Sequence, residues 1–216
     1  MKKPSAHIAS FDVDPQKGFT SLCPNELPVE GGDEIVPMLN YMASLASIRV
    51  ASKDAHSPDA PWVVNAHSEM FRPTGMVDAD LTWVRHCIPG TKGFEFLDGL
   101  SEEDYRFIVW KGIDPKYHPY GACYHDIQER LSTGVIEFLK SEGITMVLVG
   151  GLATDYCVKT TAIQLAEAGF KVVVYLEACR AIAPETELKA IEEMLAVGII
   201  PVTDKQTLTI LAEDHI

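Results

Sequence analysis

The sequence predicts an α/β protein with three layers, in which helices cover both faces of a central, mostly parallel sheet of six strands. Short apolar runs recur along the chain, and segments with the three- and four-residue apolar spacing of amphipathic helices lie between most of them. This alternation is typical of parallel sheets, whose strands are buried on both sides. A length of 216 residues suits one domain with a sizeable core, which we place at residues 1–216.

The predicted elements follow one another in a simple order. The strands are expected at Ile8 to Val13, Ile48 to Ala51, Phe107 to Trp110, Met146 to Val149, Val172 to Tyr175 and Ile199 to Val202. Helices are expected at 32–46, 134–143 and 186–198, and another from a cap at Thr154 or Asp155 through the run 161–168 to a stop at Gly169. Glycine ends several of these patterns. Residues 56–106 are rich in Pro, Gly and Trp and are predicted to pass irregularly over the active face of the sheet.

The charge of the chain and its cysteine content indicate which kinds of molecule the protein binds and where it works. Lys and Arg number 18 against 31 Asp and Glu, and a net charge of -13 argues against sequence-independent binding to nucleic acid or anionic lipid. The five cysteines are odd in number and widely spaced, which indicates a reducing cytoplasm. The opening residues carry Lys2 and Lys3 without a leader-like apolar run, and no stretch approaches membrane-spanning length. We therefore expect a cytoplasmic protein that acts on a small molecule.

Chemically active side chains follow the predicted strands. Asp14 follows the first strand, Asp54 and His56 the second, Lys111 the third and Cys157 the fourth. Because ligands of open α/β sheets bind outside the carboxyl ends of the strands, we expect these side chains on one rim. A thiol, a carboxylate and an ammonium together supply the nucleophile, proton carrier and charge stabiliser of acyl transfer through a thioester.

The position of Cys157 has two interpretations. Gly150 and Gly151 allow a sharp turn after the strand, and Thr154 or Asp155 is predicted to cap the helix that follows. Cys157 would then lie in the first helical turn, where the helix dipole favours a reactive thiolate. The alternative is an inert buried cysteine.

Four motifs in order resemble the isochorismatase-like cysteine hydrolases, and within them the nicotinamidase and pyrazinamidase group. They are "DPQKGF", "KDAH", "WVRHCIPGT" and "GGLATDYCVKTTA", and the similarity extends from about Phe11 to Val202. The resemblance implies an isochorismatase-like hydrolase fold and hydrolysis of nicotinamide to nicotinate and ammonia. It implies Cys157 as nucleophile, Asp14 as general base and then acid, and Lys111 as third member of the triad. It also implies an oxyanion hole from the N–H groups of Ala153 and Cys157, and a cis peptide bond between Leu152 and Ala153.

One position departs from the family pattern. Asp12 stands where relatives usually carry an apolar residue, and strand alternation would place it on the same face as Asp14. Spacing to Gln16 and Phe19 favours Asp14 as the base, which leaves Asp12 as a supporting acid or a lysine partner.

A divalent metal is the expected cofactor. Asp54 and His56 point to the same side of an extended segment, and a carboxylate with an imidazole suits zinc, iron or manganese, with zinc preferred. His86 is the third ligand by resemblance. A fourth ligand stays open among three residues, Asn65, His67 and Glu69.

The resemblance also places aromatic side chains at the site. Phe19 and Trp83 are expected to stack on a flat substrate ring, with plain core packing as the alternative. A later segment is either a substrate-facing loop or a solvated loop, and contains His118, Tyr120, Tyr124 and His125.

The expected partner is a small carboxamide substrate, and we expect the chain to form a homo-oligomer. Two other functions compete with nicotinamide hydrolysis. One is cysteine-dependent hydrolysis of a carbamoyl or ureido substrate on the same fold, and relatives of this kind generally lack the Asp-x-His pair. The other is a non-catalytic metal-binding protein with this fold.

Overall fold

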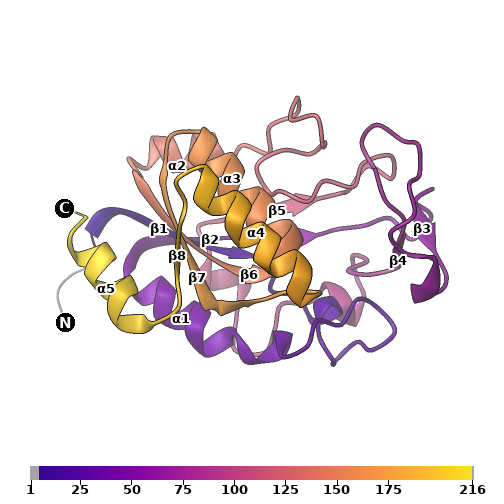
Figure 1. Cartoon of the computed structure of the whole chain (residues 1–216), viewed down its shortest axis with the longest axis horizontal. Helices are drawn as coiled ribbons and strands as arrows, with labels where there is room; N and C mark the ends of the chain where they lie inside the picture. The colour runs from indigo at the N-terminus through magenta and orange to yellow at the C-terminus, as the bar shows by residue number, and fades with distance from the viewer. Residues whose placement is uncertain (1–4, 216) are drawn as a thin grey trace.

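The fold is built on a sheet of six strands, described here from a computed structural model over residues 5–215 (Figure 1). All pairings between neighbouring strands are parallel. In spatial order the strands are β5 (Phe107–Lys111), β2 (Ala46–Asp54), β1 (Ser5–Val13), β6 (Met146–Leu152), β7 (Lys171–Arg180) and β8 (Ile200–Val202). The six predicted strands and the parallel sheet are confirmed.

Helices cover both faces of the sheet, which confirms the three layers. Alternate side chains along β6 point to opposite faces of the sheet. Met146 and Leu148 pack on the face covered by α1 (Val36–Ser44) and α5 (Lys205–Glu213). The alternate residues Val147 and Val149 pack on the opposite face. That face is covered by α2 (Val135–Ser141), α3 (Lys159–Glu167) and α4 (Pro184–Ala196). Figure 1 shows helices on both sides of the sheet. We did not predict α5 from the sequence.

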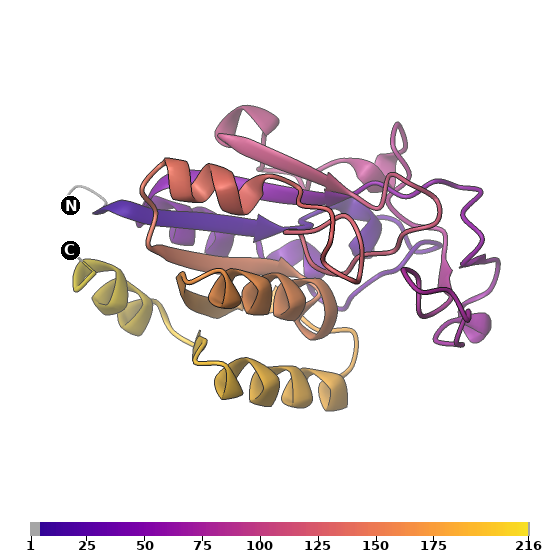
Figure 2. The same cartoon turned by 90° about the horizontal axis from the view of Figure 1, so that it is seen from above.

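Irregular segments gather at the carboxyl ends of the strands, away from the two chain ends (Figure 2). They include residues 56–106, as predicted, within which β3 (Val63–Val64) and β4 (Trp83–Val84) form a two-stranded parallel sheet. Short 3-10 helices stiffen the loops at Lys17–Phe19, Gly32–Glu34, His67–Glu69, Lys92–Phe94 and Glu102–Asp104.

Within residues 5–215, no helix combines the length and the apolar character needed to cross a membrane. Lys2 and Lys3, on which the expectation about a leader partly rests, lie outside the described residues.

The first predicted helix was too long at both ends. Residues 32–34 form a 3-10 turn, and α1 begins only at Val36, with Pro37 in its first turn. Ala46 begins β2 instead of ending the helix, because its backbone pairs with Ser5 of β1. The apolar spacing therefore located the helix, whereas pairing in the sheet decided where it ends.

The turn after β6 brings Cys157 to the rim. Gly151 adopts a φ of 132°, and a Cβ there would overlap the carbonyl oxygen of Val13, so only glycine fits. The chain then makes a π-helical turn at Thr154–Val158 that continues into α3.

The predicted capping of this turn is wrong. The cap position is taken by Ala153, and neither Thr154 nor Asp155 caps the turn. Instead the buried Asp155 carboxylate accepts the backbone N–H groups of Ile182 (3.0 Å) and Ala183 (3.2 Å), at the start of α4. It also accepts the hydroxyl of Thr186. The carboxylate therefore ties the turn that carries the cysteine to a different helix.

Asp155→Ala is expected to lower the free energy of unfolding by about 2 to 4 kcal/mol, because it leaves three part-buried donors without their charged acceptor. Urea unfolding monitored by circular dichroism measures the loss. Asp204→Ala is the control, because Asp204 caps α5 through the N–H of Thr207 on an exposed surface, and its loss should cost less. An Asp155 variant as stable as the Asp204 variant would contradict this assignment.

Candidate active site

Four buried side chains from the carboxyl ends of neighbouring strands meet at one point, as the sequence predicted. The ligand atoms of Asp14, Asp54 and Cys157 all lie within 4.8 Å of one another. Lys111, the last residue of β5, lies among them. The parallel order of β5, β2, β1 and β6 places these ends side by side.

The Lys111 ammonium is the centre of this cluster. Its Nζ lies 3.0 Å from Oδ2 of Asp14 and 3.6 Å from Sγ of Cys157, and it donates to Oδ1 of Asp54. Burial alone would lower the pKa of Lys111, but the two carboxylates raise it well above its usual value. The ammonium is therefore held charged beside the thiol.

Asp14 is placed by an unusual backbone conformation. It lies just past β1 with a φ of 44°, and Oδ1 accepts the hydroxyl of Ser52 at 2.6 Å. Burial raises the pKa of the Asp14 carboxyl to about 6, against the opposing charge of Lys111. A carboxyl that titrates near neutrality is suited to both accepting and returning a proton.

The environment of Cys157 differs from the one we expected. Burial raises the pKa of its thiol well above the usual value, and the charge of Lys111 only partly offsets this effect. The start of a helix was expected to favour the thiolate, but the side chain is 7% exposed and also faces the Asp14 and Asp54 carboxylates. The resting form is therefore the thiol, and attack requires a neighbouring base.

Asp12 belongs to a separate buried network. Its Oδ2 pairs with the guanidinium of Arg49 at 2.6 Å and accepts the hydroxyl of Tyr105 at 2.9 Å. Burial raises the pKa of Asp12 to about 6 as well, against the charge of Arg49. The expectation that Asp12 and Asp14 share a face does not hold, because the chain leaves the extended conformation at Asp14. Contacts, not pKa values, therefore distinguish the two carboxyls.

Asp54 also contacts two histidines. Its Oδ2 lies 3.2 Å from Nε2 of His56 and 3.6 Å from Nε2 of His86. The Nδ1–H of His86 donates to the carbonyl of Val84 at 2.7 Å, which leaves the Nε2 lone pair directed at this cluster. Gln16 fixes the Asp54 backbone by accepting its N–H at 2.7 Å and donating to its carbonyl at 2.9 Å. The three predicted metal ligands are thus brought together.

The candidates for a fourth ligand lie elsewhere. Asn65 and His67 are exposed, and Nε2–H of His67 donates to the carbonyl of Glu26 at 2.7 Å. Glu69 accepts the N–H of Ala66 within its own turn. In their place, His118 joins His56 and His86, and one nitrogen of each ring lies within 4.8 Å of the others.

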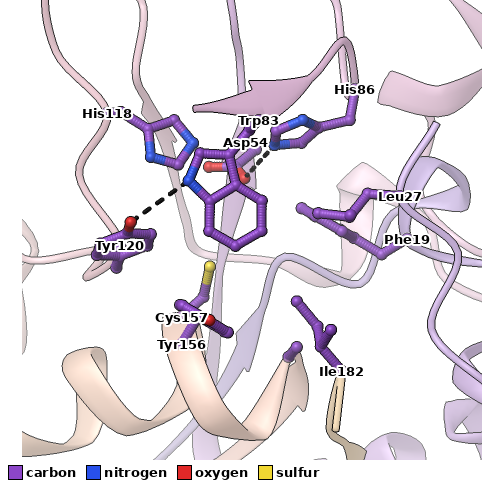
Figure 3. A pocket seen from close by; sticks show the side chains of 11 residues that line it. Phe19, Leu27, Asp54, Trp83, His86, His118, Tyr120, Tyr156, Cys157 and Ile182 are labelled. Atoms are coloured by element: carbon purple, nitrogen blue, oxygen red, sulfur yellow. Dashed lines mark hydrogen bonds and ion pairs between the residues drawn. The ribbon is translucent and has the colours of Figure 1, made fainter. Parts of the chain in front are cut away.

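A pocket opens above Cys157 and is walled by aromatic side chains (Figure 3). Phe19 and Trp83 line it, as predicted, and Tyr120 donates its hydroxyl to Asp80 at 2.7 Å. The flat faces of Phe19 and Trp83 suit stacking on a single ring. Three further lining residues were not predicted, namely Leu27, Tyr156 and Ile182. Only Tyr156 carried a signal, as the neighbour of Cys157.

The other predicted positions can be placed as well. The segment after Lys111 is divided, because His118 and Tyr120 line the pocket whereas Tyr124 packs against the core on the α2, α3 and α4 face. The peptide bond between Leu152 and Ala153 is cis, as the resemblance implied. The remaining cysteines are free and buried, as expected of packing residues, and are Cys23, Cys87, Cys123 and Cys179.

Comparison with known proteins agrees with this geometry. A family model described as the isochorismatase domain matches residues 11–206. A nicotinamidase from Acinetobacter baylyi is 30% identical over 213 residues, covering 95% of this chain and 97% of the relative. A solved Acinetobacter baumanii nicotinamidase and pyrazinamidase is similar with a TM-score of 0.80 at 30% identity, covering 95% of this chain and 100% of that one. The pyrazinamidase of Pyrococcus horikoshii, solved in complex with zinc, gives 0.71 at 32% identity, covering 92% and 99%.

Proposed function

We propose that this chain, which belongs to the isochorismatase family, is a cysteine amidohydrolase that converts nicotinamide to nicotinate and ammonia. The observation that carries the proposal is the buried cluster of Asp14, Lys111 and Cys157 at the base of a pocket that suits one ring. The similarity to nicotinamidases over nearly the whole chain supports the choice of substrate.

Acylation begins with transfer of the Cys157 proton to Asp14. The thiol is protonated at rest, and a carboxyl with a pKa of about 6 within 4.8 Å can accept the proton as sulfur attacks the carboxamide carbon. Lys111 stabilises the anionic sulfur from 3.6 Å. The carbon–sulfur bond forms as the carbonyl π bond opens.

The tetrahedral oxyanion is held by the backbone N–H groups of Ala153 and Cys157, each worth about 3 kcal/mol to the transition state. Asp14 then returns its proton to the amide nitrogen. The carbon–nitrogen bond breaks, ammonia leaves and a thioester remains on Cys157.

Deacylation reuses the same carboxylate. Asp14 accepts a proton from water as the water oxygen attacks the thioester carbon. The carbon–sulfur bond breaks, nicotinic acid is released, and Asp14 returns the proton to the sulfur. One carboxyl therefore acts twice as base and twice as acid.

The residues around Asp54 fit a divalent metal. His56 is buried, and neither of its ring nitrogens makes a hydrogen bond within residues 5–215. Burial lowers the pKa of His56 to about 4, so its ring is neutral, as metal binding requires. Asp54, His56 and His86 would hold the ion, and zinc is our choice because a similar pyrazinamidase binds it. When bound, the metal supplies a Lewis acid that orients the pyridine nitrogen.

The aromatic side chains that line the pocket bind the pyridine ring of the substrate. Trp83 and Phe19 offer flat apolar surfaces on the pocket that also contains Cys157 (Figure 3). A ring held between them places its carboxamide toward the sulfur, which converts attack into an intramolecular step.

Ammonia release from a small panel of carboxamides tests the function, with metal analysis of the same preparation. We expect turnover of nicotinamide and bound zinc. Turnover confined to ureido or carbamoyl compounds would replace this function with that of another amidohydrolase, and no turnover of the panel by metal-loaded protein would favour a non-catalytic role.

His56→Ala and His86→Ala are expected to reduce bound metal and to raise KM for nicotinamide by more than they lower kcat. The reason is that loss of the metal first weakens placement of the ring. Metal content and steady-state kinetics measure the two effects. His67→Ala is the control, because its ring contacts Glu26 rather than this cluster. Full metal occupancy in both variants would refute the ligand assignment.

We also propose that the protein works in the reducing cytoplasm, which is supported by five free cysteines. The expected homo-oligomer stays a prediction, and light scattering of the purified chain would test it.

A further inference from the structure

A third buried histidine lies at the metal end of the pocket. His118, in the loop between β5 and α2, is 4% exposed, and its backbone N–H donates to the carbonyl of Asp78 at 2.7 Å. Figure 3 shows its ring and that of His86 on either side of Asp54. One nitrogen from each of His56, His86 and His118 lies within 4.8 Å of the other two.

The His118 ring has no hydrogen-bond partner of its own. Within residues 5–215, neither of its nitrogens is hydrogen-bonded. A buried polar group without a hydrogen-bond partner costs about 1 to 3 kcal/mol of stability. Ring nitrogens left without a partner in this way therefore indicate that a ligand or an ion binds there. Each neutral imidazole also has one nitrogen with a free lone pair, which a metal ion can bind.

Packing fixes the orientation of this ring. It stacks on His56 with ring centres 4.8 Å apart and planes at 24°, and on Trp83 at 5.6 Å and 23°. Trp62 closes a third side at 4.3 Å with planes at 61°. Because three aromatic rings already hold the His118 side chain in place, it loses little conformational entropy when it binds a metal ion. This favours affinity for the ion.

We propose that His118 is a ligand of the divalent metal, together with Asp54, His56 and His86. The proposal rests on the metal-dependent part of the proposed function and adds a ligand from a loop that follows a different strand. Nitrogens around a tetrahedral zinc lie about 3.3 Å apart, given Zn–N bonds of about 2.0 to 2.1 Å. Donors within 4.8 Å can reach that spacing through small shifts of side chains.

A third imidazole changes what the site prefers to bind. Three nitrogens and one carboxylate oxygen suit zinc and other borderline ions better than magnesium or calcium, which prefer oxygen ligands. Four protein ligands also hold an ion more firmly than three, and expansion to a fifth position would still admit the pyridine nitrogen of the substrate. We therefore expect the protein to retain zinc through dialysis against a weak chelator.

The test measures metal binding directly, without substrate. Metal-free protein is titrated with Zn2+ in competition with a chromophoric chelator, for wild type, His118→Ala and the control His67→Ala. Changes in groups that only orient ligands typically cost 10- to 100-fold in metal affinity, so loss of a ligand should raise Kd at least about tenfold. His67→Ala should match wild type. A Kd for His118→Ala within twofold of wild type would overturn the proposal.

A second measurement needs no variant. X-ray absorption at the zinc edge of the wild-type protein counts the coordinated imidazoles, and we expect three. A count of two would exclude His118 even if His118→Ala folds poorly. Unchanged metal affinity with a raised KM for nicotinamide would assign His118 to substrate contact instead. Ammonia release by wild type tests the function separately, so either result can fail without the other.

Discussion

Cys157→Ala is expected to abolish nicotinamide hydrolysis while leaving the fold and ring binding intact. The Cys157 thiol is the attacking atom in the proposed reaction, and removal of a catalytic nucleophile typically costs at least about 10⁴-fold in kcat. Ring recognition depends on other groups, because Phe19 and Trp83 line the pocket independently of the sulfur. Single-turnover assays would measure the residual rate, and calorimetry would measure nicotinamide binding to the inactive variant.

Cys123→Ala provides the matched control. Cys123 is also buried and free, but it packs in the core next to α2 and α3 and does not line the pocket. Its loss should cost about 1 kcal/mol of stability through a small cavity and leave kcat unchanged. Turnover by the Cys157 variant near the wild-type rate would remove this residue from the mechanism.

The central sheet was predictable because its signal is local. Runs such as Met146 to Val149 are buried on both faces, so they read as continuous apolar segments in the sequence. The missed helix α5 shows the limit of this signal. Of its residues only Leu208 and Ala212 are buried, and its threonine and isoleucine residues weaken the intrinsic preference for a helix.

The sequence predicted the site residues that directly follow strands. It did not predict those that loops bring to the site from elsewhere in the chain. Asp14, Lys111 and Cys157 meet because parallel strands end together. His118 reaches the same site through packing of its loop against Asp78, a contact between distant segments that the sequence does not encode locally. Asp155 is a similar case, because its partners lie at the start of α4.

The protonation of Cys157 illustrates a competition that the sequence could not decide. A position near a helix start favours the thiolate by roughly 0.3 to 1 kcal/mol when exposed. Burial of the thiol disfavours the charged form by much more, and burial is known only from the packed structure. The consequence is a mechanism in which the base moves the proton as sulfur attacks.

The choice of base is tested by comparing Asp14→Asn with Asp12→Asn. Asparagine keeps the shape of aspartate but cannot accept the thiol proton, so Asp14→Asn should lower kcat/KM at least about 10³-fold. Asp12 lies two residues earlier, roughly 6 to 7 Å deeper along the strand. Its carboxylate is already occupied by Arg49 and Tyr105. We therefore expect Asp12→Asn to retain kcat/KM within about tenfold of wild type.

We expect the opposite order for stability, with Asp12→Asn losing more free energy of unfolding than Asp14→Asn. Asp12→Asn leaves the part-buried Arg49 beside a neutral partner, and loss of a hydrogen bond to a charged group typically costs about 1.5 to 3 kcal/mol. Urea unfolding measures that loss, and kinetics at a temperature well below Tm measures activity of the folded fraction. Because burial raises the pKa of both carboxyls to about 6, a pH profile alone would not distinguish them. A larger fall in kcat/KM for folded Asp12→Asn than for Asp14→Asn would place the base on β1 and refute the role assigned to Asp14.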